Sequence, residues 1–146
     1  MKKTITILLL LALLAVLAGC GGRLAPELPE QPTEFVLEDY VNPSDPEDGY
    51  AVFSYKGRSY AYYGTIKRSL RAEDLGPCLG YTVQEGEKLT DMPVCLLSAD
   101  PEANYLVRIP VGGFMDQPDF FRALDTAGKE IDTPDYIQSL DYDIWK

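Results

Sequence analysis

The chain has 146 residues, of which 23 are acidic and 13 basic, and it contains no histidine. The acidic balance argues against a nucleic-acid partner, because a phosphate backbone is bound by clustered Lys and Arg side chains. The lack of histidine excludes a Ser-His-Asp triad, a Cys-His pair and a histidine-ligated zinc site. We therefore favour a protein that is not an enzyme and holds no cofactor or metal.

The N-terminal segment has the zones of a secretory signal peptide. Lys2 and Lys3 supply the positive charge, and residues 7–18 form an unbroken apolar run. At about 1.5 Å per residue this run is roughly 18 Å long as a helix, whereas the hydrocarbon core of a bilayer is roughly 30 Å thick. Residues 1–19 are therefore predicted to be a signal peptide rather than a transmembrane helix.

Leu17-Ala18-Gly19-Cys20 ends this segment and resembles the lipobox of bacterial lipoproteins. The resemblance implies that Cys20 is lipidated, that the chain is cut just before it, and that acyl chains hold the protein in a membrane. Gly21 is not the Asp of the inner-membrane retention signal, so the resemblance implies the outer membrane or a Gram-positive cell membrane. Cleavage would remove two basic residues and no acidic one, leaving a net charge of −12.

The lipidated cysteine is followed by proline-rich sequence up to residue 34. Extended chain of this kind advances about 3.1 Å per residue, so we expect residues 20–34 to be a tether that lifts the domain up to roughly 45 Å from the membrane. Residues 35–146 are enough for one compact domain with one core.

Residues 38–49 are acidic and contain Pro43, Pro46 and Gly49, which predicts a loop before the first clear strand. An EF-hand would place oxygen ligands at positions 1, 3 and 5 ahead of a glycine at position 6. Counting back from Gly49 puts Pro46 at a ligand position. We therefore interpret the segment as a solvated turn and expect no metal site there.

Two aromatic runs, residues 50–55 and 60–65, flank Lys56-Gly57-Arg58-Ser59 and predict a β-hairpin. Gly57 suits a type II′ turn, and a four-residue loop would give the same register. The expected cross-strand pairs are Tyr55 with Tyr60 and Phe53 with Tyr62.

Aromatic side chains stand on both faces of this hairpin: one face carries Phe53, Tyr55, Tyr60 and Tyr62, and Val52 and Tyr63 pair on the other. We favour a core face, because cross-strand aromatic pairs stabilise sheets and large rings favour burial. The alternative is an exposed platform on which sugar rings or a peptide stack. The candidate residues for that surface are Tyr55, Tyr60, Tyr62, Tyr63 and, from the later glycine-rich loop, Phe114.

Basic residues gather between positions 56 and 71. The five are Lys56, Arg58, Lys67, Arg68 and Arg71. They could meet an anionic ligand or a lipid head group. We favour the simpler interpretation, in which charges at turns and strand ends protect the edges of a sheet.

Further strands are expected at residues 79–83, 93–98 and 105–110, and a hairpin is expected from residues 120–125 and 130–132. Ser69 to Gly76 predicts one or two helical turns, and Thr133-Pro134 predicts a short helix from Pro134 to about Leu140. The fold class is therefore α+β and predominantly antiparallel β. We expect a single domain of six to eight short strands in a small sandwich or barrel, with one or two short helices.

Cys78 and Cys95 remain as a pair once Cys20 is lipidated. Outside the cytoplasm such a pair predicts a disulfide, which would contribute about 3 kcal/mol in the chain-entropy model. A free cysteine would also suit the apolar run around Cys95.

The sequence favours a non-catalytic binding or accessory module, lipid-anchored and facing the extracytoplasmic side. Its expected partners are the membrane and an unidentified envelope protein or glycan. One alternative is a carboxylate-based envelope enzyme such as a glycan hydrolase, which needs two carboxyl groups about 5 to 9.5 Å apart. Another is an inhibitor or immunity-type protein whose acidic surface blocks a cationic enzyme.

Overall fold

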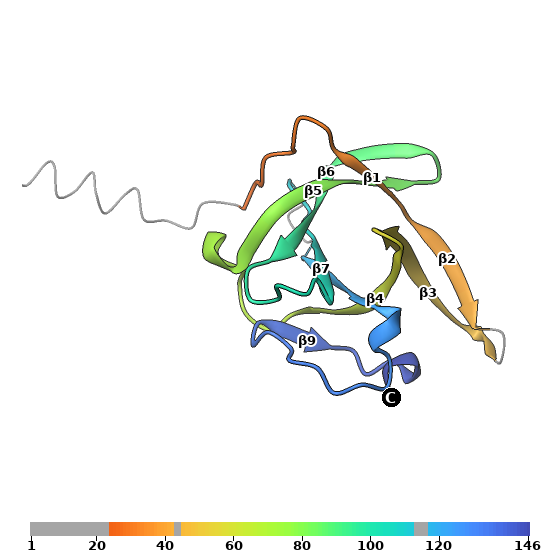
Figure 1. Cartoon of the computed structure of the whole chain (residues 1–146). Coiled ribbons are helices and arrows are strands. Elements are labelled where there is room, and N and C mark those ends of the chain that lie inside the picture. Colours follow the sequence, from red (N-terminus) through yellow and green to blue (C-terminus); the bar gives the residue numbers. More distant parts are fainter. Residues whose placement is uncertain (1–23, 43–44, 113–116) are drawn as a thin grey trace, which may run out of the picture.

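The computed structural model describes residues 24–42, 45–112 and 117–146 and is dominated by one curled sheet (Figure 1). The predicted signal peptide, the lipobox with Cys20, and Phe114 lie outside the described residues. The strands are β1 (Thr33–Val36), β2 (Glu38–Asn42), β3 (Asp45–Tyr55), β4 (Arg58–Ile66), β5 (Leu75–Gln84), β6 (Glu87–Leu97), β7 (Tyr105–Arg108), β8 (Asp119–Ala123) and β9 (Ile137–Ser139). Short 3-10 turns are η1 (Ala72–Asp74), η2 (Leu124–Thr126) and η3 (Asp143–Trp145). The predicted fold class, mostly antiparallel β, is confirmed.

The sheet curls because its two ends belong to one stretch of chain. The strand order is β1-β5-β6-β7-β8-β4-β3-β2, with β9 beside β4, and only the β1–β5 pair is parallel among the described strands. β1 and β2 stand at opposite ends of this order, yet only Leu37 separates them in sequence. The Leu37 N–H donates to the Val83 carbonyl at 2.8 Å and prolongs the β1–β5 ladder. The sheet therefore closes into a half-barrel.

Alternation along the strands creates two hydrophobic clusters. Successive side chains of a strand point to opposite faces. The inner cluster is Phe35, Phe53, Tyr60, Val94, Leu106, Phe121 and Ala123. Phe35 of β1 and Phe53 of β3 come from opposite ends of the strand order, and their rings lie 5.1 Å apart, so this cluster fills the inside of the curl.

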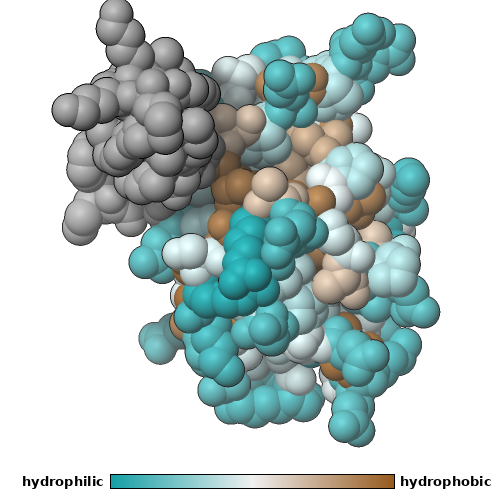
Figure 2. All heavy atoms as spheres, turned by 90° about the vertical axis from the view of Figure 1, so that its left-hand side faces the viewer, coloured by the Kyte–Doolittle hydropathy of each residue, from teal (hydrophilic) through white to brown (hydrophobic). Residues whose placement is uncertain are grey.

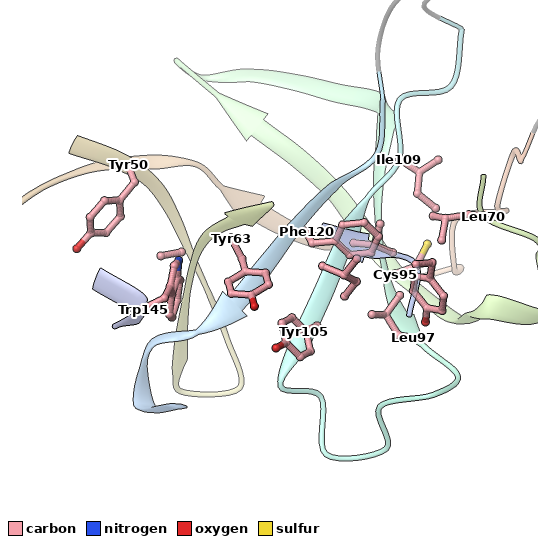
Figure 3. Packing of buried hydrophobic residues seen from close by; sticks show 13 residues of the cluster. Tyr50, Tyr63, Leu70, Cys95, Leu97, Tyr105, Ile109, Phe120 and Trp145 are labelled. Atoms are coloured by element: carbon pink, nitrogen blue, oxygen red, sulfur yellow. The ribbon is translucent and has the colours of Figure 1, made fainter. Parts of the chain in front are cut away.

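The outer cluster lies on the other face of the same strands and is covered by the C-terminal segment. It comprises Tyr50, Ala61, Tyr63, Leu70, Cys95, Leu97, Tyr105, Val107, Ile109, Phe120, Tyr136, Ile137 and Trp145. Figure 3 shows it running from Tyr50 and Trp145 past Tyr105 to Cys95 and Leu97. Adjacent β8 residues, Phe120 and Phe121, therefore serve different clusters, and both are fully buried.

The predicted hairpin is confirmed, but its register is two residues away from the prediction. Phe53 pairs with Tyr60 and Tyr55 with Arg58, which leaves a two-residue loop. Lys56 and Gly57 have φ angles of 48° and 77°, as a type I′ turn requires, rather than the type II′ turn expected. Because the side-chain period is two, this shift leaves every side chain on its predicted face.

The predicted C-terminal helix from Pro134 to Leu140 is wrong, because part of it is strand β9. β3 pairs with β4 only as far as Ala61, and β9 pairs with the residues from Gly64 to Ile66. Gly64 permits this approach, since a Cβ there would lie 2.0 Å from the Gln138 carbonyl oxygen. The backbone groups of β4 that β3 leaves unpaired therefore pair with this segment as a strand, despite the helix-start signal at Thr133-Pro134.

The helix predicted from Ser69 to Gly76 is limited to the single turn η1, and β5 already begins at Leu75. The hairpin predicted from residues 120–125 and 130–132 is also wrong, because residues 130–132 form no strand. Arg122, 5% exposed, donates instead to the carbonyl oxygens of Thr126 and Lys129. This buried guanidinium satisfies the loop backbone that a second strand would have paired.

The acidic segment 38–49 is not a loop, because most of it forms β2 and the start of β3. Val41 pairs with Gly49 and Asn42 with Asp45, with a register shift between the two pairs. A bulge of this kind tolerates the Pro46 that suggested a loop.

The chain also packs against the domain earlier than the predicted tether boundary at residue 34 implies. Leu24 packs against the outer cluster, and Thr33 and Glu34 belong to β1. Only residues 20–23 of the predicted tether precede the packed chain, a span of at most about 14 Å. In the described part of the chain, no helix has the length and apolar character needed to cross a membrane.

Candidate functional site

Two adjoining hollows lie between the β2–β3 hairpin and the C-terminal segment. One, of about 330 Å³, is lined by Asp45, Glu47, Asp48, Asp141, Tyr142 and Asp143. The other, of about 320 Å³, is lined by Tyr40, Asn42, Tyr50, Leu124, Asp143 and Ile144. Because Asp143 lines both, we treat them as one feature, the tyrosine–carboxylate groove.

Two stacked tyrosines line one end of this groove. Tyr40 and Tyr50 pair directly across β2 and β3, and their rings lie 4.9 Å apart with an interplanar angle of 23°. Tyr50 is only 9% exposed and belongs to the outer cluster, whereas Tyr40 is 38% exposed. Burial, helped by Tyr40 and Asp48, raises the pKa of Tyr50 to about 12. The pair therefore offers an uncharged aromatic surface at Tyr40, which is held in place by the buried Tyr50.

Carboxylates line the other end. They are Asp45, Glu47, Asp48, Asp141 and Asp143. Asp48 accepts from Asn42 Nδ2 at 3.0 Å, and Asp143 pairs with Lys146, which lowers the pKa of Asp143. Within the described residues, Asp143 is the only one of the five in an ion pair. The groove therefore carries a concentrated negative charge that attracts cations.

The C-terminal wall of the groove is anchored to the sheet. Trp145 is 9% exposed and donates its indole N–H to the Tyr62 carbonyl at 3.2 Å. Its ring meets Tyr63 edge-on at 5.5 Å (Figure 3). Asp141 has a φ of 55°, and its N–H donates to the Ser139 hydroxyl at 3.0 Å. Asp141 and Asp143 therefore project from a backbone that is fixed on both sides.

The tyrosines predicted as a binding platform are mostly core residues. Tyr60 is 1% exposed and Tyr63 8%, so neither can present a ring to a ligand. Tyr55 and Tyr62 are half-buried, and Tyr55 packs 5.7 Å from Phe35. Tyr62 lies 6.0 Å from Tyr142, a residue that lines the groove. Tyr62 therefore contacts a residue that lines the groove, but Tyr62 does not line the groove itself.

Two of the five residues of the predicted basic patch, Arg58 and Arg68, are used inside the fold, whereas Lys56, Lys67 and Arg71 are exposed. Arg58 pairs with Asp125 at 2.8 Å and also donates to the Ala103 carbonyl. Arg68 pairs with Asp74 at 2.8 Å and lowers its pKa. These contacts tie loops to the sheet, which supports the structural interpretation of the cluster.

A second acidic hollow of about 340 Å³ surrounds Asp100, and we call it the Asp100 pocket. Asp100 is 7% exposed, and its Oδ2 accepts from the Tyr105 N–H at 2.6 Å. Burial raises the pKa of this carboxyl group. The backbone uses this buried carboxylate to hold the turn between β6 and β7, and Glu102, Glu130 and Asp132 also line the pocket.

Cys78 and Cys95, the pair for which the sequence predicts a disulfide, lie on neighbouring strands. They are Cα partners across β5 and β6, and both are free thiols. Cys78 is half-buried and Cys95 is fully buried. Across the described ranges, no three His, Cys, Asp or Glu side chains are grouped to hold a metal ion.

No protein-family model matches this chain, and searches of curated proteins and of solved structures also found no match.

Sequence reasoning missed the groove. The acidic segment 38–49 was noted, but interpreting it as a loop hid the pairing of Tyr40 with Tyr50. The adjacent Tyr40 and Val41, both residue types that favour strands, were the available signal for a strand. No sequence signal links residues 45–48 to Asp141 and Asp143, because that contact arises only when the C-terminal segment folds back over the sheet.

Proposed function

We propose that this protein is a lipid-anchored, extracytoplasmic binding module of the bacterial envelope. Its tyrosine–carboxylate groove would bind a Lys- or Arg-bearing segment of an envelope protein. The observation that carries the proposal is the meeting of five carboxylates and a stacked tyrosine pair in one groove whose lining contains no basic residue among those described.

The two ends of the groove suit the two parts of a basic side chain. The ammonium or guanidinium group would pair with the carboxylates and lie near the rings of Tyr40 and Tyr142, where a cation–π contact is worth about 0.5–1 kcal/mol. The methylene stem would pack on Leu124 and Ile144, as Lys and Arg stems do on apolar surface. A metal ion would use only the first of these features.

The envelope location is supported by the sequence: the signal peptide, the lipobox resemblance and Cys20. Since Leu24 already packs against the domain, the anchor would hold the domain close to the membrane surface. A groove on a membrane-proximal domain suits a partner that is itself attached to the envelope.

The test compares two double variants of the full chain in uncharged detergent. Glu47→Gln with Asp141→Asn removes two charges from the groove, and Glu87→Gln with Asp91→Asn removes two exposed charges from β6. The probe is a synthetic peptide of alternating Lys and Ser, with a Glu-Ser peptide as the blank. Affinity is measured by isothermal titration calorimetry.

We expect the groove variant to bind the Lys-Ser peptide about tenfold more weakly than wild type, equivalent to 1.4 kcal/mol. The β6 variant should bind within about twofold of wild type, because isolated surface charges contribute little. Equal weakening in both variants, or no binding by wild type, would contradict the proposal.

A further inference from the structure

Cys78 and Cys95 occupy paired positions on two neighbouring strands, at a spacing that a disulfide can join. The two residues are directly opposite each other in an antiparallel pair of strands. Such partners have Cα atoms about 4.5–5.5 Å apart, inside the 4.4–6.8 Å range found for disulfides. The pair is therefore close enough to be oxidised within the folded domain.

The ladder around Cys78 is irregular. Register shifts occur on both sides of the Cys78–Cys95 pair, toward Leu75 and toward Gly80. The Cys78 Sγ lies 3.7 Å from the Gly80 carbonyl oxygen and 3.6 Å from that of Val94. Cys78 thus sits where β5 bends, and its thiol contacts the backbone of both strands.

The two thiols differ in access. Cys95 has an exposed fraction of 0% and lies within the outer cluster, beside Leu97 (Figure 3). Cys78 is half-buried, as are Leu79 and Leu96 nearby. Figure 2 turns the side on which β5 begins toward the viewer, and apolar residues are visible there among hydrophilic ones. A small reagent can therefore reach Cys78 first.

The thiols also differ in acidity. A hydrogen bond from the Cys95 thiol lowers the pKa of Cys78, whereas the pKa of Cys95 is raised, first by this pairing and then by burial. The thiolate is the reactive form of cysteine. Access and acidity thus favour the same residue as the attacking group.

We propose that Cys78 and Cys95 form a two-electron redox site that exchanges with low-molecular-weight disulfides. The Cys78 thiolate attacks one sulfur of the external disulfide, forms a mixed disulfide and releases one thiolate. The Cys95 thiol then loses its proton and attacks the Cys78 sulfur, which breaks the mixed disulfide and releases the second thiolate. The protein loses two electrons and two protons, and the external disulfide becomes two thiols. This site is independent of the tyrosine–carboxylate groove.

The experiment uses the full chain, fully reduced and then incubated with glutathione disulfide. Trypsin cuts after Arg71, Lys88 and Arg108, so Cys78 and Cys95 fall on separate peptides, 72–88 and 89–108, and Cys20 on neither. We expect mass spectrometry to find these peptides linked and about 2 Da lighter than their sum. Two free thiols after incubation would overturn the proposal, and this result needs no variant.

The order of attack is tested with Cys95→Ser and Cys78→Ser. We expect Cys95→Ser to accumulate a glutathione mixed disulfide at Cys78, and Cys78→Ser to react at Cys95 about tenfold more slowly. Equal rates in the two variants would overturn the assignment of Cys78 as the attacking thiol. Tryptophan fluorescence of Trp145 reports whether each variant is folded.

Discussion

The Asp100 pocket and the tyrosine–carboxylate groove are both acidic hollows of similar volume, yet among their described lining residues only the Asp100 pocket has a buried carboxylate, beside the exposed Glu102, Glu130 and Asp132. Asp100 is buried and accepts a hydrogen bond from the Tyr105 N–H, so its carboxyl group is used within the fold. Asp45, Glu47 and Asp141 are exposed at the rim of the groove. Burial and hydrogen-bond partners, rather than the number of acidic residues, therefore distinguish a structural carboxylate from one that is available to a ligand.

The largest expected effect lies in the Asp100 pocket. Asp100→Ala should lower the free energy of unfolding by about 2 kcal/mol, because it leaves the Tyr105 N–H buried without its acceptor. Glu47→Ala in the groove should change it by less than about 0.5 kcal/mol, as expected for an exposed position. Urea denaturation measures both, and Asp100→Asn, which keeps an acceptor oxygen, should recover part of the loss. Similar losses for Asp100→Ala and Glu47→Ala would remove the distinction.

A smaller effect is expected at the tyrosine pair. Tyr40→Ala should weaken Lys-Ser peptide binding about fivefold, which is the loss of roughly 1 kcal/mol of ring contact. Tyr40→Phe keeps both the stacking on Tyr50 and the aromatic face, so its affinity should stay within about twofold of wild type. Titration calorimetry of the two variants separates the contribution of the Tyr40 ring to peptide affinity from that of its hydroxyl group. Equal affinity for Tyr40→Ala and wild type would show that the carboxylates act alone.

The smallest effect is the pH dependence of stability, and it has opposite signs at two carboxylates. Burial raises the pKa of Asp100, so its contribution to stability is present at low pH and is lost as pH rises through that raised pKa. Arg68 lowers the pKa of Asp74, so that contribution is present above the ordinary Asp pKa of 3.8 and is lost as pH falls.

Unfolding curves between pH 3 and 7 test this difference. The stability of wild type relative to Asp100→Asn should decline with rising pH, and that relative to Asp74→Asn should increase. Parallel trends in the two comparisons would contradict the assignment of Asp100 as a carboxyl group whose pKa is raised mainly by burial.

The faces of the central strands could be predicted because they depend on a period of two. Phe53 and Tyr60 were assigned to one face and Tyr63 to the other, and both assignments are confirmed. The register was wrong by two residues, since the positive φ of Lys56 is uncommon for a non-glycine residue and the sequence did not indicate it. The local alternation of residues therefore predicts which face a side chain is on better than it predicts the cross-strand register.

The groove could not be predicted for a different reason. It depends on β9, whose pairing with β4 requires the small Gly64, and on Trp145, whose indole binds the Tyr62 carbonyl. These contacts place Asp141 and Asp143 beside the β2–β3 hairpin. Each of these contacts joins residues that are far apart in sequence. The local signal at Thr133-Pro134 therefore predicted a helix where the structure has strand β9.

The most direct test of the account is an NMR titration of the ¹⁵N-labelled full chain with the Lys-Ser peptide. The amides of residues 40–42, 45, 47–50 and 141–146 should shift in a saturable manner, and those of residues 99, 100, 102–104 and 130–132 around the Asp100 pocket should not. Shifts of equal size at both acidic hollows would contradict the claim that the tyrosine–carboxylate groove is the binding site.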